Sequence, residues 1–409
     1  MLAVALFFVC ADSGSAIDSL RTLRQAYFSA LNTSERMFLS DAAIRESEAQ
    51  NRKIFGNAFP ALSLRHQTLW KEASLTETDG MMRLAITDLT GYKEYLAFHA
   101  GGSALAVREF EKLRAKQLLL QDVAYAFFGL LQAKENTQAT GRLLHSAEER
   151  LVQLRERVRV GRSRQTDAIQ QELQIASLRA QLEENQRQSG TYTDRLSFLA
   201  GAPVGELEFK DWVVLLSSRE LSGYLSTLEL RPDVRAAQES VDLSKGLIRI
   251  AVTDYWPRLD LAADYYAYRP DSKKNINWDA ALVLNMPLWN WGARSANLDV
   301  VKSALAQKNA VLSMARRQSE LEIKNAYRNY VSSKKEFEYL KNVLDLARQD
   351  YDLQVRDDRR GLVTSLEVVE SLNRLNNAER AVNNGLLSIR LTAIELQLVS
   401  GAVPEEILP

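Results

Sequence analysis

The sequence has very little cysteine and no excess charge of either sign. Cys10 is the only cysteine in 409 residues, so the chain can form no internal disulfide and no cysteine-based metal site. Lysine and arginine together number 52, and so do aspartate and glutamate. No net field draws the chain onto nucleic acid or an anionic membrane surface. These absences disfavour redox chemistry and nucleic-acid binding.

Signatures of catalysis are missing as well. The three histidines, His66, His99 and His145, lack metal-ligand spacing, and there is no P-loop, GxSxG or HExxH motif. The segment AGGS at Ala100 lacks the flanking strand and spaced glycines of a dinucleotide site. The sequence therefore predicts no enzyme, no metal site and no cofactor.

Proline is scarce, and its eight positions are informative. None falls between Pro60 and Pro203, and none between Pro287 and Pro404. Because an interior proline breaks a helix, both spans are free to form long helices. Apart from the N-terminal segment, no stretch approaches the ~18 apolar residues of a membrane helix. Any part of the mature chain that crosses a bilayer would therefore have to be a β-strand.

The N-terminal segment MLAVALFFVCADSGSA has the apolar core and small residues of a signal peptide cleaved after Ala16. The usual basic start is missing, so a buried N-terminal helix is the alternative. Cys10 could instead accept a lipid, although Val9 before it is larger than lipidation sites prefer.

The rest of the chain is a tandem duplication. Gly161 and Gly361 are 200 positions apart, as are Gly201 and Gly401. Each copy reads as helix, two strands, long helix, glycine turn and helix. The predicted signal peptide, first repeat, linker, second repeat and tail cover residues 1–16, 17–201, 202–230, 231–401 and 402–409.

Two β-hairpins are predicted, at about residues 61–89 and 258–287. In the second hairpin apolar and polar residues alternate strictly, which is typical of a strand with two different faces. Strands of about ten residues suffice to cross a bilayer at a tilt, and Trp256 and Trp278 bound this hairpin as interfacial aromatics would. A soluble sheet packed on a helix is the alternative. The predicted lipid-facing residues are Leu259, Leu261, Tyr265, Leu282 and Leu284.

A helix predicted from Ala293 to Asp357 would be about 95 Å long. Behind Gly361, apolar residues recur at alternating steps of four and three, as in a coiled-coil seam. This seam contains Val368, Leu372, Leu375, Val382, Leu386, Ile389 and Leu396. The first repeat keeps the spacing with Ile169, Leu173, Ala176 and Ala180.

The glycine turns read as the tips of helical hairpins. Gly361 suits the left-handed position past a helix end, and Thr364 with Glu367 forms a capping box that starts the next helix. Gly161 and Ser163 are predicted to form the corresponding turn in the first repeat. There we expect no acidic side chain that reaches back to the cap, as Glu367 does in the second repeat.

Taken together, these features resemble the TolC-like outer-membrane efflux and secretion proteins, the outer membrane factors. The duplication, RPDV at Arg231, NMPLWNWGARSANL from Asn285, the paired glycine tips, and FLAG and LVSG at the repeat ends carry the resemblance. It implies a mostly α-helical protomer with membrane β-strands. Three protomers would form a twelve-stranded β-barrel in outer-membrane lipid, continued by a periplasmic α-helical coiled-coil tunnel.

The resemblance also implies a function in the cell outer membrane with a periplasmic extension. The homotrimer would be a passive channel of a tripartite efflux pump or type I secretion system. An inner-membrane transporter and a periplasmic adaptor, the membrane fusion protein, would open it. The exported substrate, the pump and the adaptor stay open. A soluble or periplasmic coiled-coil scaffold without channel activity is the alternative.

The family's entrance residues can be carried over by position. Glu367 and Glu370 match the acids that ring the periplasmic gate, and Thr166 and Asp167 match residues of its constricting network. Asp358 stands where the family has a tyrosine. Adaptor docking would fall at the tips, on Gly161, Gly361 and Leu362.

Two departures affect how the gate closes. Asp358 replaces the tyrosine and Val363 replaces an arginine, so the usual latch cannot form. Substitute partners for Asp167 or Asp358 are predicted among Arg162, Arg164, Arg359 and Arg360. As plain structural alternatives, Glu367 is only a helix cap and Glu370 only a partner of Arg374 one turn away.

Overall fold

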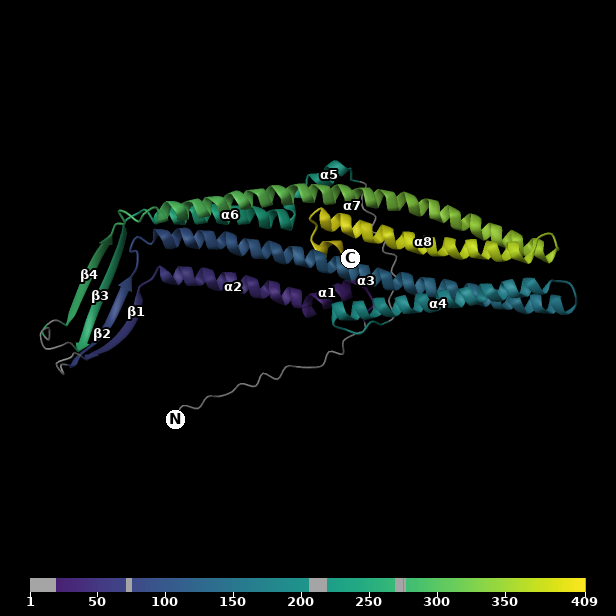
Figure 1. Cartoon of the computed structure of the whole chain (residues 1–409), viewed down its shortest axis with the longest axis horizontal. Helices are drawn as coiled ribbons and strands as arrows, with labels where there is room; N and C mark the ends of the chain where they lie inside the picture. Colours follow the sequence, from purple (N-terminus) through teal and green to yellow (C-terminus); the bar gives the residue numbers. More distant parts are fainter. Residues whose placement is uncertain (1–19, 71–75, 206–218, 269–274, 276, 409) are drawn as a thin grey trace, which may run out of the picture.

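The computed structural model describes residues 20–408 except 71–75, 206–218, 269–274 and 276. The predicted signal peptide and Cys10 therefore lie outside the described residues, as does much of the predicted linker. The molecule is elongated, with a four-stranded sheet at one end and two helical tips at the other (Figure 1).

Both repeats follow the predicted order of elements. In the first repeat the leading segment is two helices that meet at Ser34. The first repeat consists of α1 (Leu23–Thr33), α2 (Glu35–Asn57), β1 (Ala61–Trp70), β2 (Thr76–Ile86), α3 (Tyr92–Arg159) and α4 (Gln165–Ala200).

The second repeat is preceded by a short helix and a 3-10 turn, α5 (Leu221–Leu225) and η1 (Leu228–Leu230). It consists of α6 (Pro232–Thr253), β3 (Arg258–Tyr268), β4 (Trp278–Asn285), α7 (Ala293–Arg359) and α8 (Ser365–Val399), and α9 (Pro404–Ile407) follows. The two hairpins thus fall within the predicted ranges.

The long helices α3 and α7 have 68 and 67 residues. At 1.5 Å per residue each extends about 100 Å, because no proline interrupts either. Each runs from the sheet to a tip, where the chain turns and runs back along it (Figure 1). The returning helix is α4 after α3 and α8 after α7. No described helix combines the length and the apolarity that crossing a membrane requires.

The largest core lies midway along the molecule, where α1, α3, α4 and α8 meet. Tyr27, Leu120, Leu130 and Leu196 are fully enclosed there. A second core nearer the tips joins residues of α3, α4, α7 and α8. Because both cores draw on both repeats, the two copies form one folded unit.

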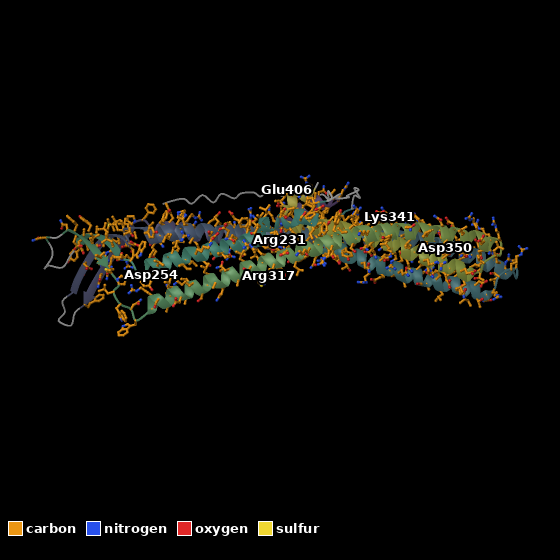
Figure 2. All side chains as sticks on the ribbon, turned by 90° about the horizontal axis from the view of Figure 1, so that it is seen from above. Arg231, Asp254, Arg317, Lys341, Asp350 and Glu406 are labelled. Carbon is orange, nitrogen blue, oxygen red and sulfur yellow. The ribbon has the colours of Figure 1, made fainter. Side chains whose placement is uncertain are left out.

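A buried arginine fixes the start of the second repeat. Arg231 is 1% exposed and donates to Asp233 and Glu322 at 2.6 and 2.7 Å, and to the carbonyl of Val399 at 3.1 Å. A buried guanidinium is stable only when carboxylates and further hydrogen bonds satisfy it. Arg231 therefore joins the beginning of α6 to α7 and to the end of α8, in the middle of the molecule (Figure 2).

Candidate functional site

The four antiparallel strands lie in chain order and share one apolar face. Leu259 pairs with Leu284 and Leu261 pairs with Leu282, so the apolar residues of β3 and β4 stand side by side. Tyr265, also predicted for this face, pairs with Met82 of β2. The face is exposed, with Leu282 at 61% and Leu284 at 66%.

The apolar face continues across the first hairpin. Its exposed members there are Leu62, Leu64, Met82 and Leu84. The register places Leu62, Leu64, Leu84 and Ile86 on one side of this hairpin. A sheet with one face of exposed leucines needs an apolar environment on that side.

The other face of the sheet carries charge. Arg83 of β2 binds Asp264 of β3 through two hydrogen bonds of 2.7 and 2.8 Å. Asp260, at the foot of β3, accepts from the Asp88 amide at 3.0 Å and from Asn285 at 2.9 Å. The two faces therefore suit two different solvents.

Aromatic side chains stand at both ends of the sheet. Near the helices Trp256, Trp289 and Trp291 are 47%, 75% and 89% exposed. At the loop end Trp278 is 69% exposed and Trp70 is 77% exposed. Rings in two such belts are typical of the headgroup levels of a bilayer.

At the tip between α7 and α8 the predicted turn is confirmed. Gly361 has φ of 75°, a left-handed conformation that glycine adopts without a steric penalty. The Thr364 amide donates to Glu367 at 2.6 Å, and the Glu367 amide donates back to the Thr364 hydroxyl. Glu370 makes no ion pair within the described chain, because Arg374 binds Asp350 at 2.7 Å. The alternative role of Glu370 as the partner of Arg374 is therefore wrong.

The tip between α3 and α4 differs from prediction in one respect. Gly161 has φ of 72°, as expected, but a returning acid is present. Asp167 accepts from the Ser163 hydroxyl at 2.8 Å and from the Arg164 amide at 3.1 Å. Asp167 is thus the acid at the third helical position that returns to the Arg164 N-cap, and Thr166 beside it is exposed. The returning acid was not predicted because the residue at the cap position is Arg164, rather than the serine or threonine of a usual capping box.

Asp358 binds arginines other than those predicted. Its Oδ2 lies 3.1 Å from Arg150 and 3.1 Å from Arg157, both on α3. Side-chain exposure is 9% for Asp358, 12% for Arg150 and 35% for Arg157. This charged cluster connects the two helical hairpins of the protomer just above the tips.

Among the described residues, the four arginines predicted as substitute partners form no ion pair with Asp167 or Asp358. Arg162, Arg164 and Arg359 are exposed at the tips and make no ion pair within the described chain, while Arg360 lies 4.0 Å from Asp357. They were proposed because they are close in sequence. The true partners are about 200 positions away from Asp358.

The predicted seam of α8 is buried at its ends, whereas the predicted seam of α4 is exposed within the protomer. Val368, Leu372 and Leu396 are buried. In contrast Ile169 is 56% exposed and Leu173 is 71% exposed, and Ala176 and Ala180 are exposed with them. The buried face of α4 instead carries Ala168, Gln171, Gln174, Ile175 and Leu178. The apolar stripe of α4 thus has no partner within the described protomer.

Amide side chains form rungs between the two hairpins, a feature that the sequence analysis did not predict. Each rung joins an asparagine of α8 to an amide of α3 or α4. Among the described residues these pairs are Gln174 with Asn373, Gln181 with Asn376, and Asn136 with Asn383, at 2.7, 2.8 and 2.9 Å, together with Gln132 and Asn384. The sequence signal that could have predicted these rungs is the presence of asparagines at inward-facing positions of the helical repeat.

Within the described residues, no cluster of three or more His, Cys, Asp or Glu side chains has the geometry of a metal site. The features that stand out are the two-faced sheet, the 100 Å helical hairpins and the capped tips. Together they fit one section of the wall of a membrane channel.

Comparison with known proteins agrees with this class. Residues 224–402 match the family described as outer membrane efflux protein. This segment holds the second repeat, whose sequence is therefore similar to that family. No curated protein matches the sequence.

Solved structures extend the similarity to both repeats. CusC, whose study concerns transmembrane channel formation, shares 18% identity and a TM-score of 0.85, over 93% of this chain and 92% of CusC. VceC of Vibrio cholerae shares 19% identity and a TM-score of 0.81, over 93% and 96%. The open-state MtrE channel of Neisseria gonorrhoeae shares 18% and 0.81, over 93% and 89%. The predicted fold class is confirmed, and the family match of residues 224–402 agrees with the predicted resemblance.

Proposed function

We propose that the chain is one protomer of a homotrimeric outer-membrane channel that serves a tripartite efflux pump or a type I secretion system. The open four-stranded sheet with one exposed apolar face carries the proposal. In lipid every backbone polar group needs a partner, so a sheet with two free edges cannot stand alone. Among the described strands β1 and β4 each pair on one side only.

Closure by three copies removes these edges. If β4 of one protomer pairs with β1 of the next, three protomers give a ring of twelve antiparallel strands. The leucine face then meets outer-membrane lipid and the charged face meets water. Tyr265, Leu282 and Leu284 are exposed, and Leu259 and Leu261 are half-buried on the same face, which supports this assignment.

The exposed stripe of α4 supports the same assembly. Ile169 and Leu173 face away from their own protomer. An open groove between α7 and α8 is lined by Val343, Leu346 and Ala378 among others. If the α4 stripe of one protomer packs into this groove of its neighbour, the apolar residues of the stripe and of the groove are both buried. The helices would then form a closed periplasmic tunnel of about 100 Å.

The tips form the proposed entrance. Glu367 and Glu370 would bring six carboxylates around the axis of a trimer, which favours cations. The cluster of Asp358 with Arg150 and Arg157 holds the two hairpins together next to this ring. Thr166 and Asp167 belong to the constriction on the first tip.

The partners in this proposal are a periplasmic adaptor and an inner-membrane transporter. The exposed turns at Gly161, Gly361 and Leu362 are the proposed adaptor contacts, with Leu362 70% exposed. An apolar residue this open at the end of a helical hairpin is suited to a contact with another protein.

The mass and the conductance of the purified protein test the proposal. We expect a detergent-dependent trimer in the outer-membrane fraction that gives discrete conductance steps in planar bilayers. Recovery as a soluble monomer that leaves a bilayer unchanged would reject the channel and restore the scaffold.

A further inference from the structure

A cavity of about 650 Å³ lies at the foot of the sheet, where strands and helices meet. Its wall comes from the end of β2 and start of α3, from the connection between α6 and β3, and from the end of β4. Asp254, one of its residues, marks the place beside the sheet in Figure 2. The volume is within the usual range of small-molecule sites.

One wall of the cavity is aromatic and apolar. Tyr92 and Trp256 are stacked with their ring centroids 4.9 Å apart and an interplanar angle of 26°. The rings are 42% and 47% exposed, and Pro257 and Met286 extend the wall. A surface of this kind accepts the apolar part of an amphiphile.

Two cations line the same cavity. Lys93 donates to Asp254 at 2.8 Å, and Arg258 donates to Asp260 at 3.2 Å through Nε. An ammonium has three donors and a guanidinium five, so each cation keeps donors for an anionic ligand. The two side chains are 46% and 53% exposed and can reach a ligand from the open side.

Glu94 supplies an unsatisfied acceptor. It lines the cavity, and its Oε2 is shielded from solvent without a hydrogen-bond partner in the described chain. Glu94 lies in the first turn of α3, where the helix N-terminus favours a negative charge. A shielded carboxylate oxygen without a donor is costly, so turning the Glu94 carboxylate toward the open side of the cavity, where a ligand can donate to it, would be favourable.

The balance of charge excludes a simple anion as the ligand. Lys93 and Arg258 face three carboxylates in the lining, those of Asp88, Asp254 and Glu94. A bare phosphate would meet a net negative wall. A ligand that carries both a phosphate and an amine satisfies the cations and the free acceptor together.

We propose that this cavity binds a phosphate ester with a primary amine, the headgroup of a zwitterionic phospholipid. The phosphate binds Lys93 and Arg258, the ammonium binds Glu94, and the glycerol end lies against Tyr92 and Trp256. The inference rests on the proposed function, because only a sheet in the bilayer brings its foot to the headgroup level. Lipid and free phosphoethanolamine share this chemistry.

Native mass spectrometry of the detergent-purified trimer tests the proposal with three lipids. Phosphatidylethanolamine has phosphate and a donating amine, phosphatidylcholine a quaternary ammonium without N–H, and phosphatidylglycerol no amine. We expect the first to bind at least tenfold more tightly than the other two. Glu94→Gln should abolish this preference, and Lys93→Gln with Arg258→Gln should weaken all three.

Glu111→Gln, an exposed acid further along α3 that pairs with Arg108, is the matched control and should leave lipid binding unchanged. Equal binding of the three lipids, or an unchanged preference in Glu94→Gln, overturns the proposal.

Two further readouts separate the headgroup site from the channel. A wild-type trimer that conducts but shows no lipid preference rejects the site and leaves the channel standing. Titration with soluble phosphoethanolamine and with inorganic phosphate measures ligand binding to the cavity even if the sheet never enters a bilayer. Binding of phosphoethanolamine alone supports the site, whereas binding of both or of neither rejects it.

Discussion

Replacing Asp358 by asparagine should release the two hairpins of the protomer from each other at the tips. The change leaves the guanidinium groups of Arg150 and Arg157 near a neutral amide, where each lay 3.1 Å from the carboxylate. Removing one partner of a buried ion pair costs about 3 to 5 kcal/mol. Because Arg157 is 35% exposed and can turn to water, we expect the lower end, about 3 kcal/mol.

A loss of about 3 kcal/mol corresponds to a shift of roughly a hundredfold in a two-state equilibrium. If the cluster holds the entrance closed, Asp358→Asn should raise the open fraction in single-channel recordings by about that factor. Asp357→Asn is the matched control. The Asp357 side chain is 37% exposed, and its carboxylate lies 4.0 Å from the Arg360 guanidinium, so the pair is weak. Exposed pairs of this kind contribute about 0 to 1 kcal/mol.

The double variant Asp358→Asn with Arg157→Gln measures the coupling between the two residues. We expect it to recover part of the lost closure, because one uncompensated charge has gone. Indistinguishable recordings from the Asp358 and Asp357 variants would refute the assignment of the cluster to the entrance.

The other predictions concern the sheet, the acidic ring and the junction of the repeats. Leu282→Arg should destabilise the folded protein in bilayers by about 2 to 4 kcal/mol, whereas Val283→Arg on the charged face should be mild; urea titration checks both. Glu367→Gln with Glu370→Gln should lower cation selectivity, read as the reversal potential across a salt gradient. Burial of Asp233 disfavours its charged form, but hydrogen bonds from its arginine partner outweigh this and hold its pKa below the usual value. Its stabilising contribution is therefore complete above about pH 4 and is lost as the pH falls through the folded pKa. The difference in Tm between wild type and Asp233→Asn should narrow from pH 7 to pH 3.

The sheet could be predicted in detail because its pattern has a period of two. Apolar residues at alternate positions of both strands fix which residues share a face, and Leu261 does pair with Leu282. The helical tips were predictable for a similar reason, since glycine past a helix end and a following cap act over a few residues.

The face of α4 could not be predicted from apolarity alone. Gln171 occupies an inward position, fully buried, and its amide donates to the carbonyl of Ala147 at 2.9 Å. The more apolar Ile169 and Leu173 point outward instead. A stripe that meets another copy looks the same in the sequence as one that meets its own chain.

The partners of Asp358 were out of reach for a different reason. Arg150 and Arg157 belong to the other repeat, and nothing in their local sequence distinguishes them from the exposed arginines at Arg162 and Arg164. Only the side-by-side packing of the two hairpins brings them together. Contacts between repeats depend on this register, which single residues do not encode.

The amide rungs restrict how the two helical hairpins can move relative to each other. Asn376 is 1% exposed and Asn136 is 5% exposed, so sliding one hairpin along the other would leave several buried amides unpaired at about 1 to 3 kcal/mol each. Splaying the hairpins at the tips leaves the rungs further up intact. Such a motion breaks only the cluster of Asp358 and its nearest neighbours. If the tips are the entrance proposed above, the rungs would favour opening by a pivot, in which the paired amides fix the register and the charged cluster near the tips sets the energy of closure.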